Sequence, residues 1–208
     1  MTNLREGLLG GLGRSGDPKL VAQARRYVAA LATDPTAIPP AIRQPVLATF
    51  AINATPADWD QLLALTRAEK SPVAKNRFVA LLGFARDPAL ATRALAMLQG
   101  DVLTDPQKAT LLRSVANEHP DQAFDWAVAH LSLVNGFLEA STRASFVPLL
   151  GAGSVDPAMP GKITAYGNAN LPEGSRAGVR QALSAIAVRR DAAARLQPGV
   201  TAWLAQAK

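Results

Sequence analysis

The residues best suited to metal chemistry are the two histidines, His119 and His130. Helical zinc peptidases place two histidines four residues apart on one helix face, with further ligands and an open coordination position. Here the histidines are eleven residues apart, and Glu118 beside His119 does not complete an H-E-x-x-H pattern. The sequence therefore predicts no metal site and no cofactor in this chain, and it favours exposed turn and helix-surface positions for both histidines.

Nucleotide-binding and nucleophilic motifs are also incomplete. Residues 11–16 match G-x-G-x-x-G, but no strand precedes them, so we interpret this segment as a turn that ends a helix over residues 3–12. Ser154 and Ser175 each follow a glycine, yet neither completes G-x-S-x-G after a strand. No pair of carboxylates stands out as an acid and a base. We expect no catalytic residue in this chain.

A possible binding feature is the pair Arg176 and Arg180, which are four residues apart on a predicted helix. Side chains at this spacing share a helix face, and two guanidinium groups there could bind a peptide carboxylate. Plain solvent exposure is the alternative interpretation of the same pair.

Three tryptophans lie within apolar helical stretches: Trp59, Trp126 and Trp203. Large aromatic side chains in such surroundings usually pack in the core or between helices. We therefore predict packing for all three, with a ligand platform as the alternative.

The elements that must carry these side chains begin at regularly placed prolines. Five prolines 32 to 38 residues apart each start a helix-like stretch, namely Pro18, Pro56, Pro88, Pro120 and Pro157. Four of them follow a residue whose side-chain oxygen can cap a helix: Asp17, Thr55, Asp87 and Asp156. Proline suits the first helical position, because the amide there has no intrahelical partner. The spacing predicts one helix pair per repeat.

Apolar segments between these helices predict the partner helix of each pair, at residues 40–53, 72–85, 105–116 and 139–150. Pro45 and Pro148 should bend or limit two of them. Strand signals are nearly absent. The sequence predicts an all-α fold, a solenoid of stacked antiparallel helix pairs (a HEAT/armadillo-like superhelix) with about five to six pairs in one domain over 1–208. The opening helix has no preceding partner, which suggests a fragment of a larger protein.

Composition narrows the class of protein further. No apolar run reaches the roughly 20 residues of a membrane span, and the first residues lack the pattern of a secretory signal. We expect a soluble protein of the cytoplasm or the periplasm, since the lack of cysteine fits both. The net charge is +6, but aromatic residues are only 5% and basic residues form no run longer than two, so we expect no nucleic-acid partner.

A set of short motifs, in order along the chain, resembles one family. The first are Leu4–Gly13, Gly16–Pro18, Ala24–Tyr27, Ile38–Val46 and Trp59–Leu62. The later ones are Asn117–Pro120, Ala123–Val128, Ser175–Arg176, Arg180–Leu183 and Trp203–Leu204. Together they resemble the C-terminal helical domain of gluzincin aminopeptidases, which include puromycin-sensitive, endoplasmic-reticulum and membrane alanyl types.

This resemblance implies an intact protein that removes N-terminal residues from peptides, with zinc held in a separate upstream catalytic domain. This chain would be the noncatalytic C-terminal part, which encloses the active-site chamber and contacts the peptide substrate. Its partners would be the upstream domain of the same polypeptide and the peptide. The alternative is a stand-alone HEAT-like scaffold that binds a protein partner on its concave face.

Overall fold

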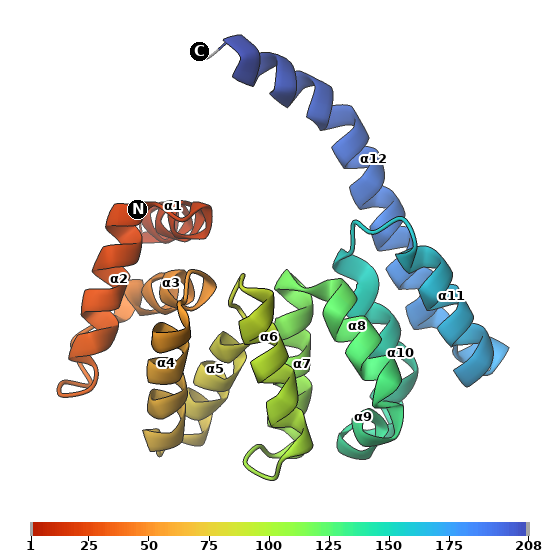
Figure 1. Ribbon diagram of the computed structural model, residues 1–208, viewed down its shortest axis with the longest axis horizontal. Coiled ribbons are helices and arrows are strands. Elements are labelled where there is room, and N and C mark those ends of the chain that lie inside the picture. Colours follow the sequence, from red (N-terminus) through yellow and green to blue (C-terminus); the bar gives the residue numbers. More distant parts are fainter. Residues whose placement is uncertain (1, 207–208) are drawn as a thin grey trace. The chain divides into compact units, whose positions relative to one another are not determined.

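The computed structural model describes residues 2–206, and this part of the chain is helical and contains no strand (Figure 1). The predicted all-α fold is confirmed. The chain forms two compact units, residues 1–119 and residues 120–208. Within each unit consecutive helices pack in pairs, as in a helical solenoid. That 1–208 behaves as one domain stays a prediction.

Unit 1 contains two rows of helices. The elements are α1 (Thr2–Ser15), α2 (Pro18–Ala30), α3 (Pro40–Ile52), α4 (Pro56–Ala68), α5 (Pro72–Leu82), α6 (Pro88–Ala96), the 3-10 turn η1 (Met97–Gln99) and α7 (Asp105–Glu118). Helices α1, α3, α5 and α7 contact one another in this order, while α2, α4 and α6 each pack on the helix that follows. This pairing buries apolar side chains between the rows, among them Val28, Phe50, Leu62, Leu90 and Leu111.

The helix starts in unit 1 follow the predicted capping chemistry. Asp17 accepts hydrogen bonds from the amides of Lys19 and Leu20, and Asp87 accepts one from Ala89. Thr55 forms a capping box with Asp58. Three predicted helix starts in this unit are therefore confirmed, and the partner helices α3, α5 and α7 lie where their apolar segments predict them.

The glycine-rich segment before α2 differs from the prediction of a turn. Helix α1 continues to Ser15, and only Gly16, at φ +82°, leaves the helix. Gly13 lies within α1, and it must be glycine because a Cβ atom there would collide with the Thr49 side chain of α3. The glycine thus permits a close helix contact.

Unit 2 contains α8 (Pro120–Ala129), α9 (Leu131–Phe137), α10 (Ala140–Leu150), the 3-10 turn η2 (Gly151–Gly153), α11 (Met159–Asn170), the 3-10 turn η3 (Glu173–Ser175) and α12 (Ala177–Gln206). Helix α10 packs against α8, α11 and α12, and α11 packs against α12. Buried side chains here include Phe124, Val134, Phe146, Met159 and Ile163.

The predicted start at Pro157 is wrong, because α11 begins two residues later at Met159. The Asp156 side chain accepts a hydrogen bond from the Ala158 amide (2.9 Å), which makes a turn before the helix. Pro45 and Pro148 lie inside α3 and α10, and neither proline ends its helix.

None of the described helices is both long and apolar enough to cross a membrane.

Candidate functional site on helix α12

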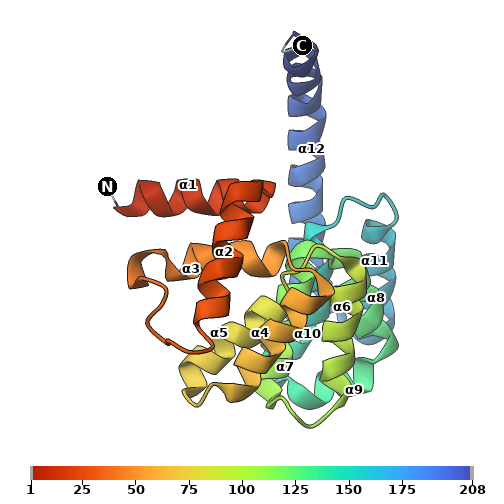
Figure 2. The same ribbon diagram turned by 60° about the vertical axis from the view of Figure 1, so that its left-hand side comes forward.

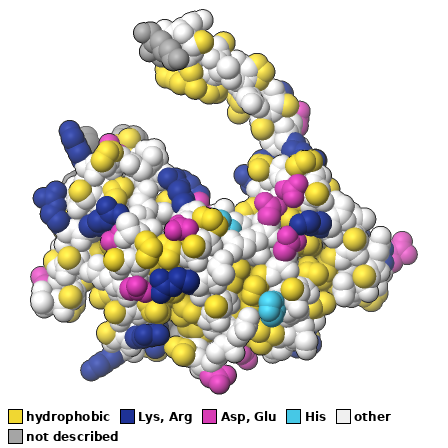
Figure 3. All heavy atoms as spheres, in the orientation of Figure 1, with side chains coloured by type: hydrophobic (Ala, Val, Ile, Leu, Met, Phe, Trp, Pro, Cys, Tyr) yellow, Lys and Arg dark blue, Asp and Glu magenta, His cyan; other side chains and the backbone are white. Residues whose placement is uncertain are grey.

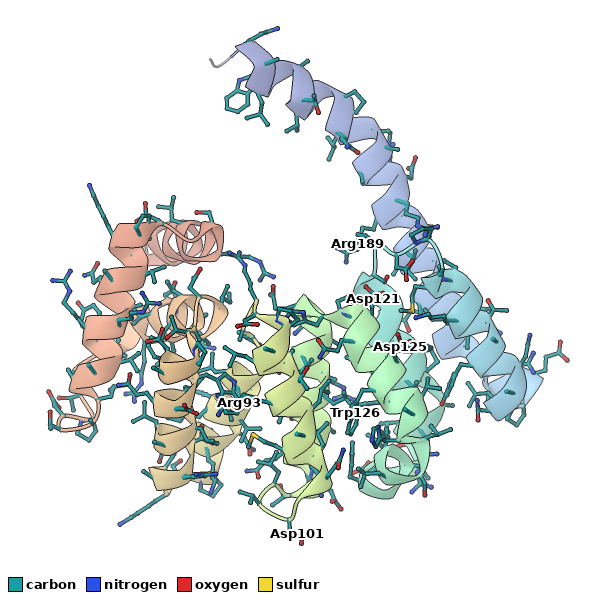
Figure 4. All side chains as sticks on the ribbon, viewed as in Figure 1. Arg93, Asp101, Asp121, Asp125, Trp126 and Arg189 are labelled. Carbon is teal, nitrogen blue, oxygen red and sulfur yellow. The ribbon has the colours of Figure 1, made fainter. Side chains whose placement is uncertain are left out.

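Polar contacts in unit 1 join equivalent helices of successive repeats. Arg25 of α2 pairs with Asp58 of α4 (2.9 Å), and Asp60 of α4 pairs with Arg93 of α6 (2.5 Å; Figure 4). Arg93 also lies over the Trp59 ring, with Cζ 4.3 Å from its centroid. Each ion pair joins residues 33 positions apart, about one repeat, and this spacing was the sequence signal that could have revealed them.

The first of these pairs changes the titration of Asp58. Burial raises the pKa of this carboxyl, but hydrogen bonds from the Thr55 amide and from Arg25 outweigh burial, so the pKa lies below its ordinary value. The carboxylate therefore stays charged at neutral pH, where it both caps α4 and binds Arg25.

The ends of α1, α3, α5 and α7 meet in a second polar network. Nδ2 of Asn53 donates to the Gly13 carbonyl (2.9 Å), Arg14 pairs with Glu118, and the Arg86 side chain donates to the Arg14 carbonyl. His119 belongs to this network, since the Ala85 carbonyl accepts from its Nε2 (2.8 Å). These groups serve to join the helix ends.

Both histidines are half-buried, so the exposed positions expected for them are only partly correct. His130 stacks on Trp126 with ring centroids 4.4 Å apart, and its Nδ1 bonds to the Trp126 carbonyl. No group of three or more potential metal ligands lies together among the described residues.

The tryptophans separate into three environments. Trp59 is buried and its Nε1 donates to the Leu82 carbonyl (3.0 Å), which confirms packing at this position. Trp126 is half-buried against His130. The prediction for Trp203 is wrong within unit 2, because this side chain is 66% exposed.

Helix α8 carries two carboxylates that link it to later parts of unit 2 (Figure 4). Ser154, fully buried, donates to Asp121 (2.5 Å), and Lys162 of α11 pairs with Asp125 (2.8 Å). The hydrogen bond to Asp125 raises the pKa of Lys162. These residues fix α8 against the η2 and α11 region, on which α12 rests.

The two arginines proposed from sequence occupy different environments at the start of α12. Arg176 precedes the helix and is half-buried, with Nε donating to the Leu171 carbonyl (3.0 Å) and Nη1 to Asn168 (2.8 Å). It thereby joins the end of α11 to the start of α12. Arg180, inside α12, is exposed. The predicted placement of both on one helix is therefore wrong for Arg176, whose guanidinium is already engaged.

The first turns of α12 are seated tightly. Val179, Ala182 and Ile186 are buried, and Gly178 lies so close to α10 that an added Cβ would be 2.6 Å from the Ser145 Cα. This close contact fixes the orientation of the first turns of α12. The side chains on the opposite face of these turns are exposed.

One exposed face of α12 carries an open, nearly flat strip of surface, which we call the α12 groove and which is formed by six residues of this helix alone: Gln181, Ser184, Ala185, Val188, Arg189 and Ala192. Arg189 projects from this part of α12 (Figure 4). Within the described part of the chain, the side chains of Arg180 and Arg189 make no hydrogen bond or ion pair, whereas the Arg190 side chain donates to the Asp156 carbonyl and Arg195 pairs with Asp191. Sequence reasoning missed Arg189, although lining residues recur at three- and four-residue spacing.

A cavity of about 110 Å³ lies between α2 and α3, lined mainly by apolar side chains that include Leu20, Tyr27, Ile42 and Pro45. It is too small for a peptide, whereas the groove on α12 is open and bordered by a free cation. The α12 groove presents an exposed cation beside small and apolar side chains, and its lining residues include no carboxylate or histidine that could act as a base for Ser184.

Comparison with known families decides the identity of this fold. Residues 1–188 match the model of the ERAP1-like C-terminal domain. The chain belongs to this family. No curated protein matches the chain. The resemblance to the C-terminal domain of gluzincin aminopeptidases is thereby confirmed, and an ERAP1-like C-terminal domain implies a catalytic domain in the same polypeptide. The match includes Arg176, Arg180 and most of the α12 groove, while the rest of α12 lies beyond it.

Proposed function

We propose that this ERAP1-like domain is the noncatalytic C-terminal part of a zinc-dependent aminopeptidase, where it encloses the active-site chamber and helps to accommodate the peptide substrate. The observation that carries the proposal is the family match over residues 1–188. Zinc would belong to the catalytic domain, which precedes this chain in the polypeptide. The chain itself would supply only binding surface.

The free face of α12 supports the part of the proposal that concerns substrate. Peptides end in a carboxylate, and an unpaired guanidinium is the side chain best suited to bind one. The Arg180 side chain is exposed and makes no hydrogen bond or ion pair within the described structure, whereas Arg176 is held by α11. Of the pair proposed from sequence, Arg180 is the one free to contact peptide, and Arg176 positions the helix that carries it.

The test compares the chain, the catalytic portion of the parent enzyme, and the two joined in one polypeptide. We expect the chain alone to hydrolyse no aminoacyl reporter substrate, with or without added zinc, because His119 and His130 are engaged with backbone carbonyls of separate segments. Joining the chain to the catalytic portion should raise turnover of peptides.

Two results would contradict this. The first is peptidase activity of the isolated chain that binds zinc stoichiometrically and is lost on adding a chelator. The second is peptide turnover by the catalytic portion that is the same with and without the chain, which would favour a stand-alone scaffold instead.

A further inference from the structure

The second half of α12 is not covered by the other described helices of unit 2. The C-terminal part of this helix extends past them in two views (Figures 1 and 2). All of residues 193–206 are exposed. The exposed side chains include four large apolar ones, at 66% for Leu196, 53% for Val200, 66% for Trp203 and 54% for Leu204.

These apolar side chains form a stripe, which we define as Val188, Ala192, Leu196, Val200 and Trp203. Their separations of four, four, four and three residues keep them on one side of a helix. Apolar side chains follow this half of α12 in the space-filling view (Figure 3). The stripe continues the α12 groove, because Val188 and Ala192 belong to both.

A helix of this composition needs packing to persist. Pro198 removes one backbone hydrogen bond, which destabilises a helix interior by about 3 kcal/mol. Gly199 adds conformational entropy to the unfolded state, which destabilises the helix by about 1 kcal/mol. Isolated helices of fewer than about 15 residues are marginal in water even without such residues. A surface that covers the stripe would supply the missing stabilisation.

A second copy of the chain is a poor occupant, because the stripe is small. Residues 188–206 of a helix span about 28 Å at 1.5 Å per residue, and a width of about 10 Å gives about 300 Å² per copy. A symmetric pair would bury about 600 Å² in total, well below the roughly 1,200 Å² of specific interfaces. A partner in the same polypeptide does not need such an area, since linkage raises its effective concentration to about the millimolar range.

The charges beside the stripe describe the partner surface. Residues 188–206 contain three arginines, Arg189, Arg190 and Arg195, and one acidic residue, Asp191. Asp191 is already paired with Arg195, and Arg189 makes no ion pair among the described residues. An apolar surface with an acidic rim would complement this half of the helix.

We propose that the α12 stripe docks onto an apolar, acidic-rimmed surface of the catalytic portion of the same polypeptide, and so latches the ERAP1-like domain to it. This inference rests on the proposed function, because that function supplies the catalytic portion. The latch is carried by residues that lie largely beyond the family match, which ends at Val188. It therefore adds a docking element to the domain.

The experiment measures binding of the chain to the separately prepared catalytic portion by titration calorimetry. The test variant carries Leu196→Asp, Val200→Asp and Trp203→Asp, and the control carries Val73→Asp, Val102→Asp and Val155→Asp, which replace equally exposed apolar residues elsewhere. We expect the test variant to bind at least about tenfold more weakly and the control to bind within about twofold of the unaltered chain. Thermal unfolding should be unchanged in both, because all six residues are exposed.

The outcomes separate the two proposals. If the unaltered chain binds and the test variant binds equally well, the latch is wrong while the proposed function stands. If the unaltered chain does not bind the catalytic portion, both fail. Dimerisation of the chain alone in analytical ultracentrifugation, or binding to phosphatidylcholine–phosphatidylglycerol vesicles, would also overturn the latch if the test variant abolished it, because the stripe would then have another occupant.

Discussion

Asp58 shows how much of unit 1 can depend on a single carboxylate. It accepts hydrogen bonds from the amide of Thr55 and from Arg25, and so it closes the first turn of α4 and ties α4 to α2. Its side chain is 13% exposed, while that of Arg25 is 42% exposed, so solvent screens part of their attraction. The cap should therefore contribute more to stability than the ion pair.

Replacing Asp58 by Ala should lower the free energy of unfolding by about 1–2 kcal/mol, through loss of the capping box and of a partly screened ion pair. Replacing Asp60 by Ala on the same helix is the matched control, and the more exposed pair with Arg93 predicts a loss below about 0.5 kcal/mol. Denaturant unfolding of each variant measures both values.

The effect of Asp58 should also depend on pH. Its pKa is lower in the folded state than the ordinary value of 3.8, so its stabilisation is present above that value and is lost as pH falls through the folded pKa. The difference between the unaltered chain and Asp58→Ala should hold from neutral pH to about pH 4 and shrink in more acid solution. A difference that grows on acidification would contradict the assignment.

Residues that cap their own helix could be predicted from the sequence, and residues whose partners lie in another element could not. Asp17, Thr55 and Asp87 cap helices within a few positions of themselves, so their types reveal their roles. Arg176 donates hydrogen bonds to Leu171 and Asn168 at the end of α11. These contacts depend on how the turn between α11 and α12 folds, which the residue types do not reveal. Arg180 and Arg189 are the same residue type as Arg176, but their side chains donate no hydrogen bond within the described structure.

At the scale of elements, close contacts at glycine decide where helices meet. Periodic apolar residues and prolines predicted most helices, because these signals lie within one element. The predicted end of α1 and the predicted start of α11 are wrong. In the first, the close contact with Thr49 accounts for a glycine inside the helix that sequence alone would assign to a turn, and in the second, a turn at Asp156 delays the helix.

Gly178 tests this role in unit 2. Alanine is the better helix former by about 1 kcal/mol, but a Cβ at Gly178 would lie 2.6 Å from the Ser145 backbone, so Gly178→Ala should destabilise unit 2 by about 1–3 kcal/mol. Gly161→Ala in α11 is the matched control, because nothing lies within 4 Å of a Cβ there, and it should be neutral or stabilising. Thermal unfolding of the two variants gives the comparison, and equal effects would contradict the close contact.

At the scale of the whole molecule, the helical solenoid and its family followed from the sequence, because both rest on the order of motifs along the chain. The division into units at residue 119 and the free half of α12 did not. Apolar periodicity indicates that one face of a helix is buried, but it does not indicate which surface covers that face. Trp203 illustrates this, since its surroundings in sequence resemble a core while its side chain is exposed in the described structure.

Photocrosslinking in the full polypeptide that carries this domain would test its proposed contact with substrate. A peptide with a photoreactive group at its carboxyl end would be bound to the enzyme, irradiated, and the crosslinked residues located by mass spectrometry. We expect crosslinks within this chain on the first free turns of α12, from Arg180 to Ala185 and ahead of the stripe. A peptide with the same group near its amino end should instead label the catalytic portion. Crosslinks from the carboxyl end that all fall outside residues 1–208 would contradict a substrate-contacting role for this domain.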